Sequence, residues 1–202
     1  MPQYFENIDI SDRKTYHYNA VINGVSYPFI GADGTFSKDS LDDGTKLLLE
    51  TIIQADLGTK ILDVGCGAGP IGLILAATDS KRSVTMCDVN LTALDLAKQN
   101  AEINGVSKRV EIVESDVYHN INSIYDTIVS NPPIRAGKKV TYAIYDGACA
   151  HLQEGGSLII VIRRKQGADS VQAYLNNLFG NASVLASHKG YRVIKATKKG
   201  AK

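Results

Sequence analysis

The sequence lacks the features that mark membrane, secreted and metal-dependent proteins. No apolar run approaches the roughly 20 residues that a membrane-spanning helix needs, and no basic segment followed by an apolar core opens the chain, so we predict no signal peptide. The three cysteines are odd in number and widely spaced, which fits neither a disulfide framework nor a zinc site. The four histidines have no metal-ligand spacing. We therefore expect a cytoplasmic protein with no membrane partner and no metal.

The chain also has little net charge, because 22 Lys and Arg residues nearly balance 21 Asp and Glu residues. The charges are unevenly divided. Residues 1–130 hold 10 basic and 18 acidic residues, whereas residues 131–202 hold 12 basic and 3 acidic residues. This division indicates that the C-terminal part faces a polyanion, although a basic segment that is merely solvated would have the same composition.

Strand and helix patterns alternate from residue 60 onward. Apolar strand patterns lie at 61–64, 83–87, 110–113, 127–129 and 157–162, and helical patterns at 70–77, 90–104 and about 140–152. Strands separated by helices imply right-handed crossovers and a mostly parallel sheet. Segments 182–187 and 191–196 are joined by three residues, which permits only an antiparallel hairpin. We therefore predict an α/β, Rossmann-like fold with a mostly parallel seven-stranded sheet and an antiparallel C-terminal hairpin.

The length of 202 residues suits a single domain. Segments 16–22 and 25–29 predict a small β-hairpin, because Asn23-Gly24 between them suits a type I′ turn, in which both central residues need positive φ. We interpret residues 1–44 as an extension that holds this hairpin and a loop, and residues 45–202 as the Rossmann-like core. We expect the protein to be a monomer.

A glycine-rich turn between the first core strand and its helix is the strongest sign of a ligand site. It reads Asp63-Val64-Gly65-Cys66-Gly67-Ala68-Gly69-Pro70. Glycines let a backbone approach a ligand closely, and a helix start presents N–H groups to an anion. Gly67, Gly69 and Gly72 also match the dinucleotide pattern. Asp63 would repel a pyrophosphate, however, and can pair with a cation, so the sequence favours a cationic ligand.

Two further acidic residues follow the next two strands. Asp88 ends the second core strand, 25 residues after Asp63, where a carboxylate can accept both hydroxyls of a ribose. Asp116 follows the third strand. Either residue alone is also common in turns and at helix N-caps. Their occurrence in register after consecutive strands favours a binding role.

The loop after the fourth strand, Asn131-Pro132-Pro133-Ile134, indicates the chemistry. An aromatic or amide amine is a poor nucleophile because its lone pair is delocalised. Two acceptors that bind its two N–H groups draw the nitrogen toward tetrahedral geometry, and the Asn131 side-chain oxygen and the Pro132 carbonyl are candidates. Two successive prolines stiffen the loop for such positioning. A Pro-Pro pair after a strand can also be a simple chain breaker.

These motifs together resemble those of class I S-adenosylmethionine-dependent methyltransferases. The pattern Asp63-x-Gly65-x-Gly67-x-Gly69 is similar to the first motif of that class, whose cofactor carries an ammonium and a sulfonium group. The resemblance implies that Asp116 holds the adenine amino group. It implies cofactor contacts at Asp63, Gly65, Cys66, Gly67, Gly69, Asp88, Val89, Asp116, Val117 and Asn131.

The segment from Asn131 to Lys138 resembles more closely the ribosomal RNA small subunit methyltransferase C family, which methylates N2 of guanine. Other segments agree with this family, namely Gly34–Ser37, Leu41–Thr45, Arg164–Ala168 and Lys189–Val193. The resemblance covers nearly the whole chain and suits a short, single-domain form. It implies catalysis by Asn131, Pro132 and Pro133, and a ribosomal RNA or small ribosomal subunit as partner.

The resemblance also implies a substrate face. Ile134 stands where related enzymes usually have an aromatic ring that stacks on the target base. Either Ile134 makes an apolar contact, or a ring comes from elsewhere, such as Phe36 or Tyr191. The residues expected to bind substrate are Phe36, Ile134, Arg135, Lys138, Arg164, Lys165, Tyr191 and Arg192.

Two other functions stay open. A methyltransferase of protein glutamine or of DNA or RNA adenine N6 would use a similar loop, but such enzymes prefer an aromatic residue at the position of Ile134. A non-catalytic module that binds cofactor or RNA would keep the fold. It would have no need of the amine acceptors Asn131 and Pro132, which are both present.

Overall fold

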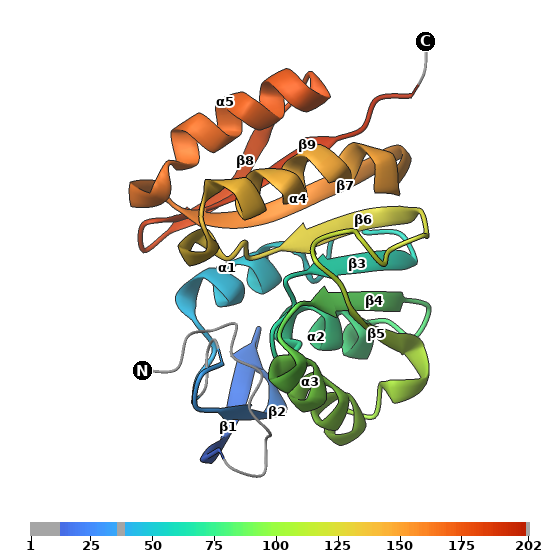
Figure 1. Cartoon of the computed structure of the whole chain (residues 1–202), viewed down its shortest axis with the longest axis vertical. Coiled ribbons are helices and arrows are strands. Elements are labelled where there is room, and N and C mark those ends of the chain that lie inside the picture. Colours follow the sequence, from blue (N-terminus) through green and yellow to red (C-terminus); the bar gives the residue numbers. More distant parts are fainter. Residues whose placement is uncertain (1–12, 36–38, 201–202) are drawn as a thin grey trace.

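The computed structural model describes residues 13–35 and 39–200, and its core is one seven-stranded sheet with helices on both faces (Figure 1). The strands are β1 (Thr15–Ile22), β2 (Val25–Ala32), β3 (Lys60–Val64), β4 (Ser83–Asp88), β5 (Val110–Glu114), β6 (Tyr125–Ser130), β7 (Leu152–Arg163), β8 (Ser183–His188) and β9 (Tyr191–Thr197). The α-helices are α1 (Asp43–Ile52), α2 (Pro70–Thr78), α3 (Leu91–Ile103), α4 (Lys138–His151) and α5 (Ala168–Phe179).

The order of strands in the large sheet is β5-β4-β3-β6-β7-β9-β8. The first five are parallel to one another, whereas β9 runs antiparallel to both β7 and β8. β1 and β2 form a separate antiparallel hairpin. This arrangement confirms the predicted fold class, including the antiparallel hairpin at the C-terminal end and the small hairpin before the core.

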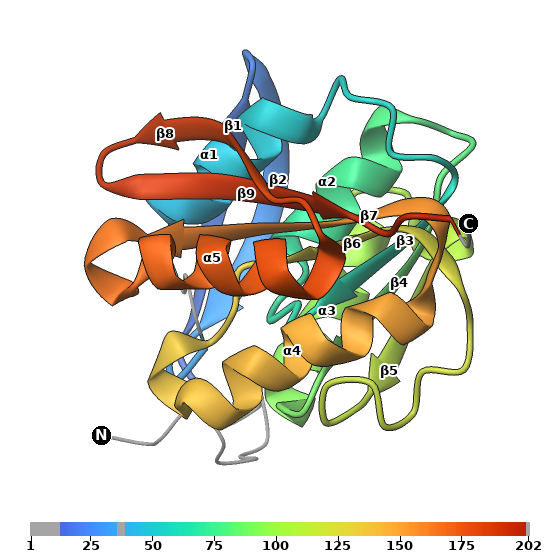
Figure 2. The same ribbon diagram turned by 90° about the horizontal axis from the view of Figure 1, so that it is seen from above.

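The central strands are apolar on both sides because helices cover both faces of the sheet (Figure 2). In β7, Ile159 and Val161 belong to the core beneath α1, α2 and α3, while Leu158, Ile160 and Ile162 belong to the core beneath α4 and α5. Alternate residues of one strand thus serve two cores. This is why residues 158–162 of β7 read as a continuous apolar run in the sequence.

Two helix starts differ in how well the sequence marks them. Asn90 caps α3 as expected, because its side chain accepts a hydrogen bond from Ala93 N. The helix α5, in contrast, was not among the predicted elements. It begins after Gly167, which has no side chain to cap it, so the usual start signal is missing.

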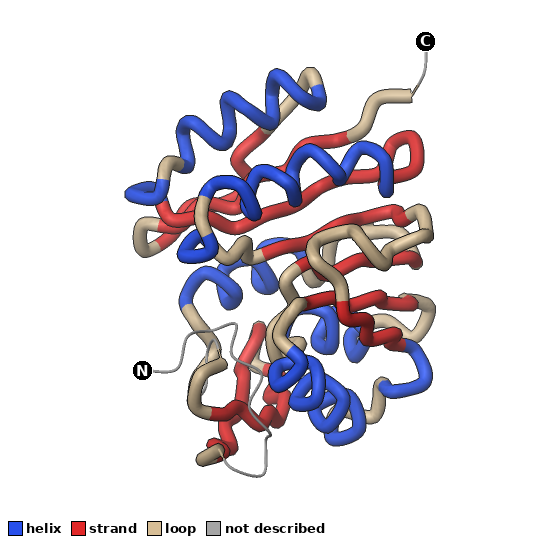
Figure 3. The backbone as a smooth tube through the Cα atoms, viewed as in Figure 1, coloured by secondary structure: helices blue, strands red, loops and turns tan. Residues whose placement is uncertain are grey.

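The order of the strands places the candidate residues at one edge. The chain leaves β3 toward β4 and β5 on one side, and later toward β6 and β7 on the other. A crevice at such a switch point, outside the carboxyl ends of the strands, is the usual ligand site of open α/β sheets. Figure 3 shows the loops that leave these strands along one edge of the sheet. Within the described ranges, no helix is long and apolar enough to cross a membrane.

Candidate active site

The glycine-rich turn between β3 and α2 is fastened to the end of β4. Gly65 N and Cys66 N both donate hydrogen bonds to the Cys87 carbonyl, at 2.8 and 3.0 Å. Gly67 and Gly69 have φ angles of 56° and 88°, which glycine adopts without steric cost. The turn therefore follows a path that suits a close approach of a ligand to the backbone.

Asp63 lies beneath this turn and is fully buried. Its Oδ2 atom accepts a hydrogen bond from Gly72 N at 2.9 Å, but its Oδ1 atom is buried without a partner in the described part of the chain. Burial raises the pKa of Asp63 to about 7, against the effect of the Gly72 hydrogen bond and with a further contribution from Asp88. A cationic group would satisfy the unpaired oxygen. The ammonium of S-adenosylmethionine therefore fits this position.

Asp88, at the end of β4, is also buried, with 4% of its surface exposed. Its two oxygens accept hydrogen bonds from Gly67 N at 2.9 Å and Asn90 N at 3.0 Å. Asp88 thus braces the glycine-rich turn from the end of the second core strand, where this kind of fold places the acid that binds a ribose.

The loop after β5 carries the remaining predicted cofactor residues. Asp116 is exposed, and Val89 and Val117 are half-buried. Val117 has a φ of 52°, which a β-branched residue rarely adopts. Its carbonyl accepts hydrogen bonds from Ser115 Oγ at 3.0 Å and Cys87 Sγ at 3.5 Å. Backbone strain of this kind is concentrated at functional sites.

Cys66 and Cys87 of the site are unreactive thiols. Burial raises the pKa of Cys87 to about 12 and that of Cys66 well above its usual value. Both thiols therefore stay protonated at neutral pH and are poor nucleophiles. In the described ranges, no group of three or more His, Cys, Asp or Glu residues could hold a metal ion.

The Asn-Pro-Pro loop begins where β6 ends and lies against the glycine-rich turn. Ser130 Oγ donates a hydrogen bond to the Val64 carbonyl at 2.7 Å, which ties the end of β6 to the end of β3. A Cβ atom on Gly65 would lie 3.7 Å from Pro133 Cδ, an ordinary contact distance. The candidate catalytic loop and the candidate cofactor loop are therefore direct neighbours.

The Pro132 carbonyl already accepts one hydrogen bond, from Ile134 N at 2.8 Å. The intervening Pro133 has φ −74° and ψ 79°, the values of a tight three-residue turn. A carbonyl oxygen has two lone pairs, so one is left for an amine. This turn holds Ile134 close to the two prolines.

The start of α1 holds the side chain of Asn131. Its Nδ2 atom donates hydrogen bonds to Thr45 Oγ1 at 3.0 Å and to Asp42 Oδ1 at 3.3 Å. Asp42 is the N-cap of α1, and the same oxygen accepts from Gly44 N and Thr45 N, both at 3.0 Å. Asp42 and Thr45 belong to the family-like segment Leu41–Thr45, but no role was predicted for them. Nothing in the spacing of residues so far apart in the chain could have revealed this contact.

Beside the Asn-Pro-Pro loop is a cavity of about 120 Å³ between the starts of α4 and α5. Its walls include Ile134 and Tyr142, and its polar residues include Lys138, Gln166 and Ser170. Apolar walls with a few polar groups are typical of the lining of small-molecule sites.

The predicted substrate residues fall into two groups. Lys138, Arg164 and Lys165 are exposed and have no ion-pair partner among residues 13–35 and 39–200. Arg192 instead pairs with Asp169. The Tyr191 hydroxyl accepts a hydrogen bond from Arg163 Nε at 2.6 Å, and the Arg163 guanidinium lies over the Tyr191 ring.

For two predicted substrate residues, Phe36 and Arg135, the structure describes no side chain. Phe36 lies outside the described residues, so the structure gives no position for it. The backbone of Arg135 lies in the short helix η3 (Ile134–Ala136), just after the two prolines. Its role stays a prediction.

Comparison with known proteins places the chain among methyltransferases. Residues 26–195 match the family described as Methyltransferase small domain. The uncharacterized protein YbxB of Bacillus subtilis is 42% identical over 190 residues, which cover 93% of each protein. The ribosomal RNA small subunit methyltransferase C of Cronobacter sakazakii is 36% identical over 167 residues, covering 81% of this chain and 47% of that protein. The chain thus spans about half the length of the latter relative.

Solved structures share the fold. The T. thermophilus 16S rRNA N2 methyltransferase RsmC, in complex with AdoMet and guanosine, superposes with a TM-score of 0.81 and 27% identity, over 92% of this chain and 51% of that chain. A ribosomal protein L11 methylase from Lactobacillus delbrueckii superposes with a TM-score of 0.67 at 19% identity, over 78% of this chain and 79% of that one. The second likeness concerns the fold alone.

Proposed function

Because the chain belongs to the Methyltransferase small domain family of S-adenosylmethionine-dependent methyltransferases, we propose that it methylates an exocyclic amino nitrogen, N2 of a guanine in small-subunit (16S) ribosomal RNA. The orientation of the Asn131 amide carries this proposal. Its nitrogen is held by Thr45 and Asp42, and its oxygen accepts no hydrogen bond from any residue that the structure describes. That oxygen is the acceptor that an amine substrate needs.

The cofactor would be held by the carboxylates and the glycine-rich turn. Asp63 Oδ1 would bind its ammonium, Asp88 its ribose hydroxyls and Asp116 its adenine amino group. When bound, S-adenosylmethionine supplies a methyl carbon whose bond to sulfur breaks, the electron pair going to sulfur, as the amine nitrogen bonds to that carbon.

The residues of this chain act on the amine. Asn131 Oδ1 and the second lone pair of the Pro132 carbonyl accept its two N–H groups and draw the nitrogen toward tetrahedral geometry. Such bonds strengthen as positive charge develops on the nitrogen, so they favour the transition state over the ground state. No strong base is needed, because the nitrogen loses its extra proton to water afterwards.

Two observations support an RNA substrate. The first is the similarity to the ribosomal RNA small subunit methyltransferase C of Cronobacter sakazakii and to the T. thermophilus 16S rRNA N2 methyltransferase. The second is a group of exposed basic residues that have no ion-pair partner in the described part of the chain, namely Lys138 in the wall of the cavity next to Ile134, and Arg164 and Lys165, which directly precede the wall residue Gln166. Such residues can bind the phosphates beside a base that has been flipped out of its stack.

A methylation assay with labelled S-adenosylmethionine tests the proposal. The wild-type protein and Asn131→Ala are each incubated with ribosomal RNA, intact small subunits, DNA and ribosomal protein, and the modified nucleoside is identified by mass spectrometry. We expect N2-methylguanosine in RNA from the wild type only. Label in adenine or glutamine would replace the guanine assignment, and no transfer to any substrate would contradict catalysis altogether.

A further inference from the structure

We infer that Asp42 and Thr45 are positioning residues that set the orientation of the Asn131 amide, and that the turn of the C-terminal hairpin holds α1 in place for this. The inference rests on the proposed function, because it assumes that Asn131 Oδ1 accepts the substrate amine. It adds two residues and a supporting element that the chemistry of the Asn-Pro-Pro loop does not predict.

Asp42 determines which end of the amide faces α1. Rotating an Asn amide by 180° exchanges its oxygen and its nitrogen, and only the nitrogen can donate. Asp42 Oδ1 acts as an acceptor, since it receives two backbone N–H groups at 3.0 Å. With the Asn131 oxygen turned toward it, two acceptors would stand 3.3 Å apart with no proton between them. The nitrogen therefore faces Asp42, and the oxygen faces away from α1.

Thr45 holds the amide that Asp42 orients. Its Oγ1 atom is the nearer acceptor, at 3.0 Å from Asn131 Nδ2. Thr45 is 2% exposed, so little water competes for this bond. A hydroxyl can donate as well as accept, so Thr45 alone would not select one orientation. The two residues act together, from the first turn of one helix.

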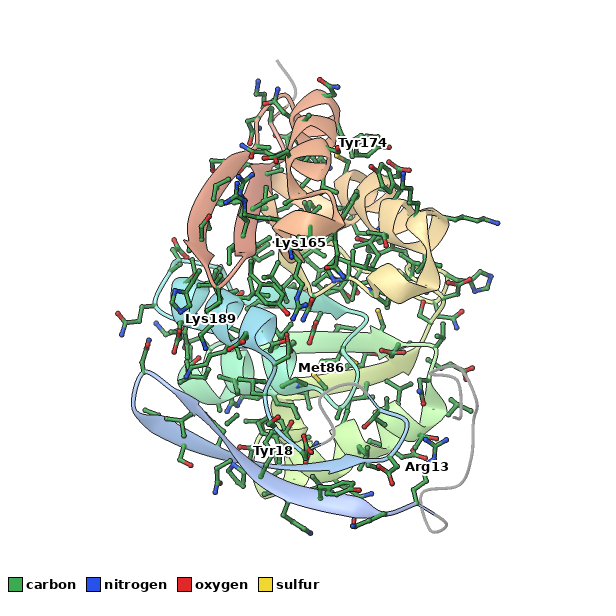
Figure 4. The ribbon with its side chains drawn as sticks, turned by 90° about the vertical axis from the view of Figure 1, so that its left-hand side faces the viewer. Arg13, Tyr18, Met86, Lys165, Tyr174 and Lys189 are labelled. Atoms are coloured by element: carbon green, nitrogen blue, oxygen red, sulfur yellow. The ribbon has the colours of Figure 1, made fainter. Side chains whose placement is uncertain are left out.

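The C-terminal hairpin closes on the other side of this helical turn. Lys189 Nζ lies 3.0 Å from Asp43 Oδ1, and Figure 4 shows Lys189 beside α1. The Tyr191 ring packs so closely on Gly44 that a Cβ atom there would lie 2.7 Å from Tyr191 Cε1. Arg163 in turn holds the Tyr191 hydroxyl. The first turn of α1 is thus confined between the hairpin and the Asn-Pro-Pro loop.

This arrangement predicts a specific kinetic effect. Thr45→Val removes the hydroxyl at nearly constant shape, so Asn131 Nδ2 keeps only the longer bond to Asp42 and its amide is held less firmly. Misplacement of a reacting group by about 1 Å can cost about 100-fold, and we expect kcat to fall about 10- to 100-fold. The KM values for cofactor and RNA should stay within about twofold, because Thr45 is not among the residues proposed to bind either ligand.

The experiment compares Thr45→Val with two matched variants. Thr45→Ser keeps the hydroxyl and should restore kcat. Thr51→Val removes another hydroxyl from the same helix, one that bonds to the Leu47 carbonyl and not to Asn131, and should leave kcat unchanged. The second readout is the pair of side-chain amide resonances of Asn131 in ¹⁵N-labelled protein, assigned by their loss in Asn131→Asp. These should move in Thr45→Val only.

The two readouts separate this inference from the proposed function. If Thr45→Val keeps wild-type kcat, or leaves the Asn131 resonances in place, the positioning role is wrong even where RNA methylation is established. If the resonances move but the wild type methylates nothing, the orientation of the amide stands and the proposed function is wrong. Should Thr45→Val fail to fold, Asp42→Ser takes its place, since its shorter side chain keeps an N-cap hydroxyl and withdraws from Asn131.

Discussion

At the scale of single residues, the two buried carboxylates of the cofactor loop differ in one respect. Both oxygens of Asp88 receive a backbone N–H group. Asp63 has one oxygen so bonded and one buried without a partner in the described ranges. The ionisation of Asp63 therefore depends more strongly on whether a cation is bound beside it, and this dependence can be measured.

Cofactor affinity should depend on pH through Asp63. Burial raises the pKa of this carboxyl to about 7 in the free protein. An ammonium group binds the ionised form, so we expect Kd to rise about tenfold for each pH unit below 7 and to level off above it. Calorimetry at about pH 6, 7 and 8 measures this, and binding at the lowest pH should release close to one proton. Asp63→Asn should bind the cofactor weakly, with a Kd that does not depend on pH in this range. If the wild-type Kd does not change with pH, Asp63 does not bind the cofactor.

The free protein should respond to pH in the opposite direction. Since the folded pKa of Asp63 is raised above its usual value, the unfolded state gives up this proton first as pH rises. The free energy of unfolding contributed by Asp63 is therefore greatest below about pH 4 and is lost as pH rises toward 7. The thermal shift caused by S-adenosylmethionine should accordingly grow over the same range.

Asn131→Asp is a sharper test of the loop than its replacement by alanine. A carboxylate at this position can still accept an N–H group. In this structure, however, the new carboxylate would stand about 3.3 Å from Asp42 Oδ1, and like charges at this distance repel. We expect low activity in Asn131→Asp and partial recovery in Asn131→Asp with Asp42→Asn, measured as single-turnover methylation. Equal activity in both would show that Asp42 does not act on this side chain.

At the scale of elements, one buried side chain joins the small hairpin to the cofactor loop. Asn100 on α3 is fully buried, and its Nδ2 atom donates to the carbonyls of Ile30 and Ala68, both at 3.0 Å. Its oxygen accepts from Ile30 N at 2.7 Å. The hairpin of β1 and β2, the helix α3 and the glycine-rich turn therefore meet at one amide.

Asn100→Leu should weaken both the fold and the cofactor site. It would remove the partner of three backbone groups, the buried Ala68 carbonyl and the partly buried N–H and carbonyl of Ile30, at a cost of about 1–3 kcal/mol for each group left unsatisfied. The matched variant Asn104→Ala removes an exposed bond to the Pro28 carbonyl of β2 and a local bond to the Asn100 carbonyl, and should cost about 1 kcal/mol. Urea unfolding and cofactor titration compare the two. If both variants lose the same stability and cofactor affinity, the buried bonds of Asn100 contribute no more than the exposed bond of Asn104.

Helices and strands could be predicted where the residues that start an element agreed with the spacing of its apolar residues. Residues 158–162 of β7 form a continuous apolar run, β3, β4 and β6 contain shorter apolar stretches, and Asn90 marks the start of α3 with its own side chain. The helix α5 has apolar residues at helical spacing, Val171, Leu175 and Phe179, but it starts after an uncapped glycine. The contact of α1 with Asn131 could not be predicted, because no local pattern fixes which helix start meets which loop.

In the whole molecule, the acidic and the basic parts of the sequence occupy different regions. Figure 1 shows the residues before 131 mainly in one half, with β3, β4, β5 and the small hairpin, and the later residues in the other, with β7, β8, β9, α4 and α5. The acidic half carries the candidate cofactor residues other than Asn131, and the basic half borders the cavity beside Ile134. The composition predicts that the basic part faces a polyanion. The structure adds which basic side chains form ion pairs within the described ranges.

That separation predicts which cations bind RNA. Lys138→Ala, Arg164→Ala and Lys165→Ala should each weaken binding of a ribosomal RNA fragment and lower the slope of log K against log salt by about 1, because each lost phosphate contact releases fewer counterions. Arg192→Ala should change the slope less, since Arg192 already pairs with Asp169. Lys108→Ala, in the short helix η2 (Ser107–Arg109) before β5, controls for the general effect of removing a charge. Fluorescence anisotropy between about 50 and 200 mM salt gives the slopes. If all five variants share the wild-type slope, the basic half is solvated surface and the RNA lies elsewhere.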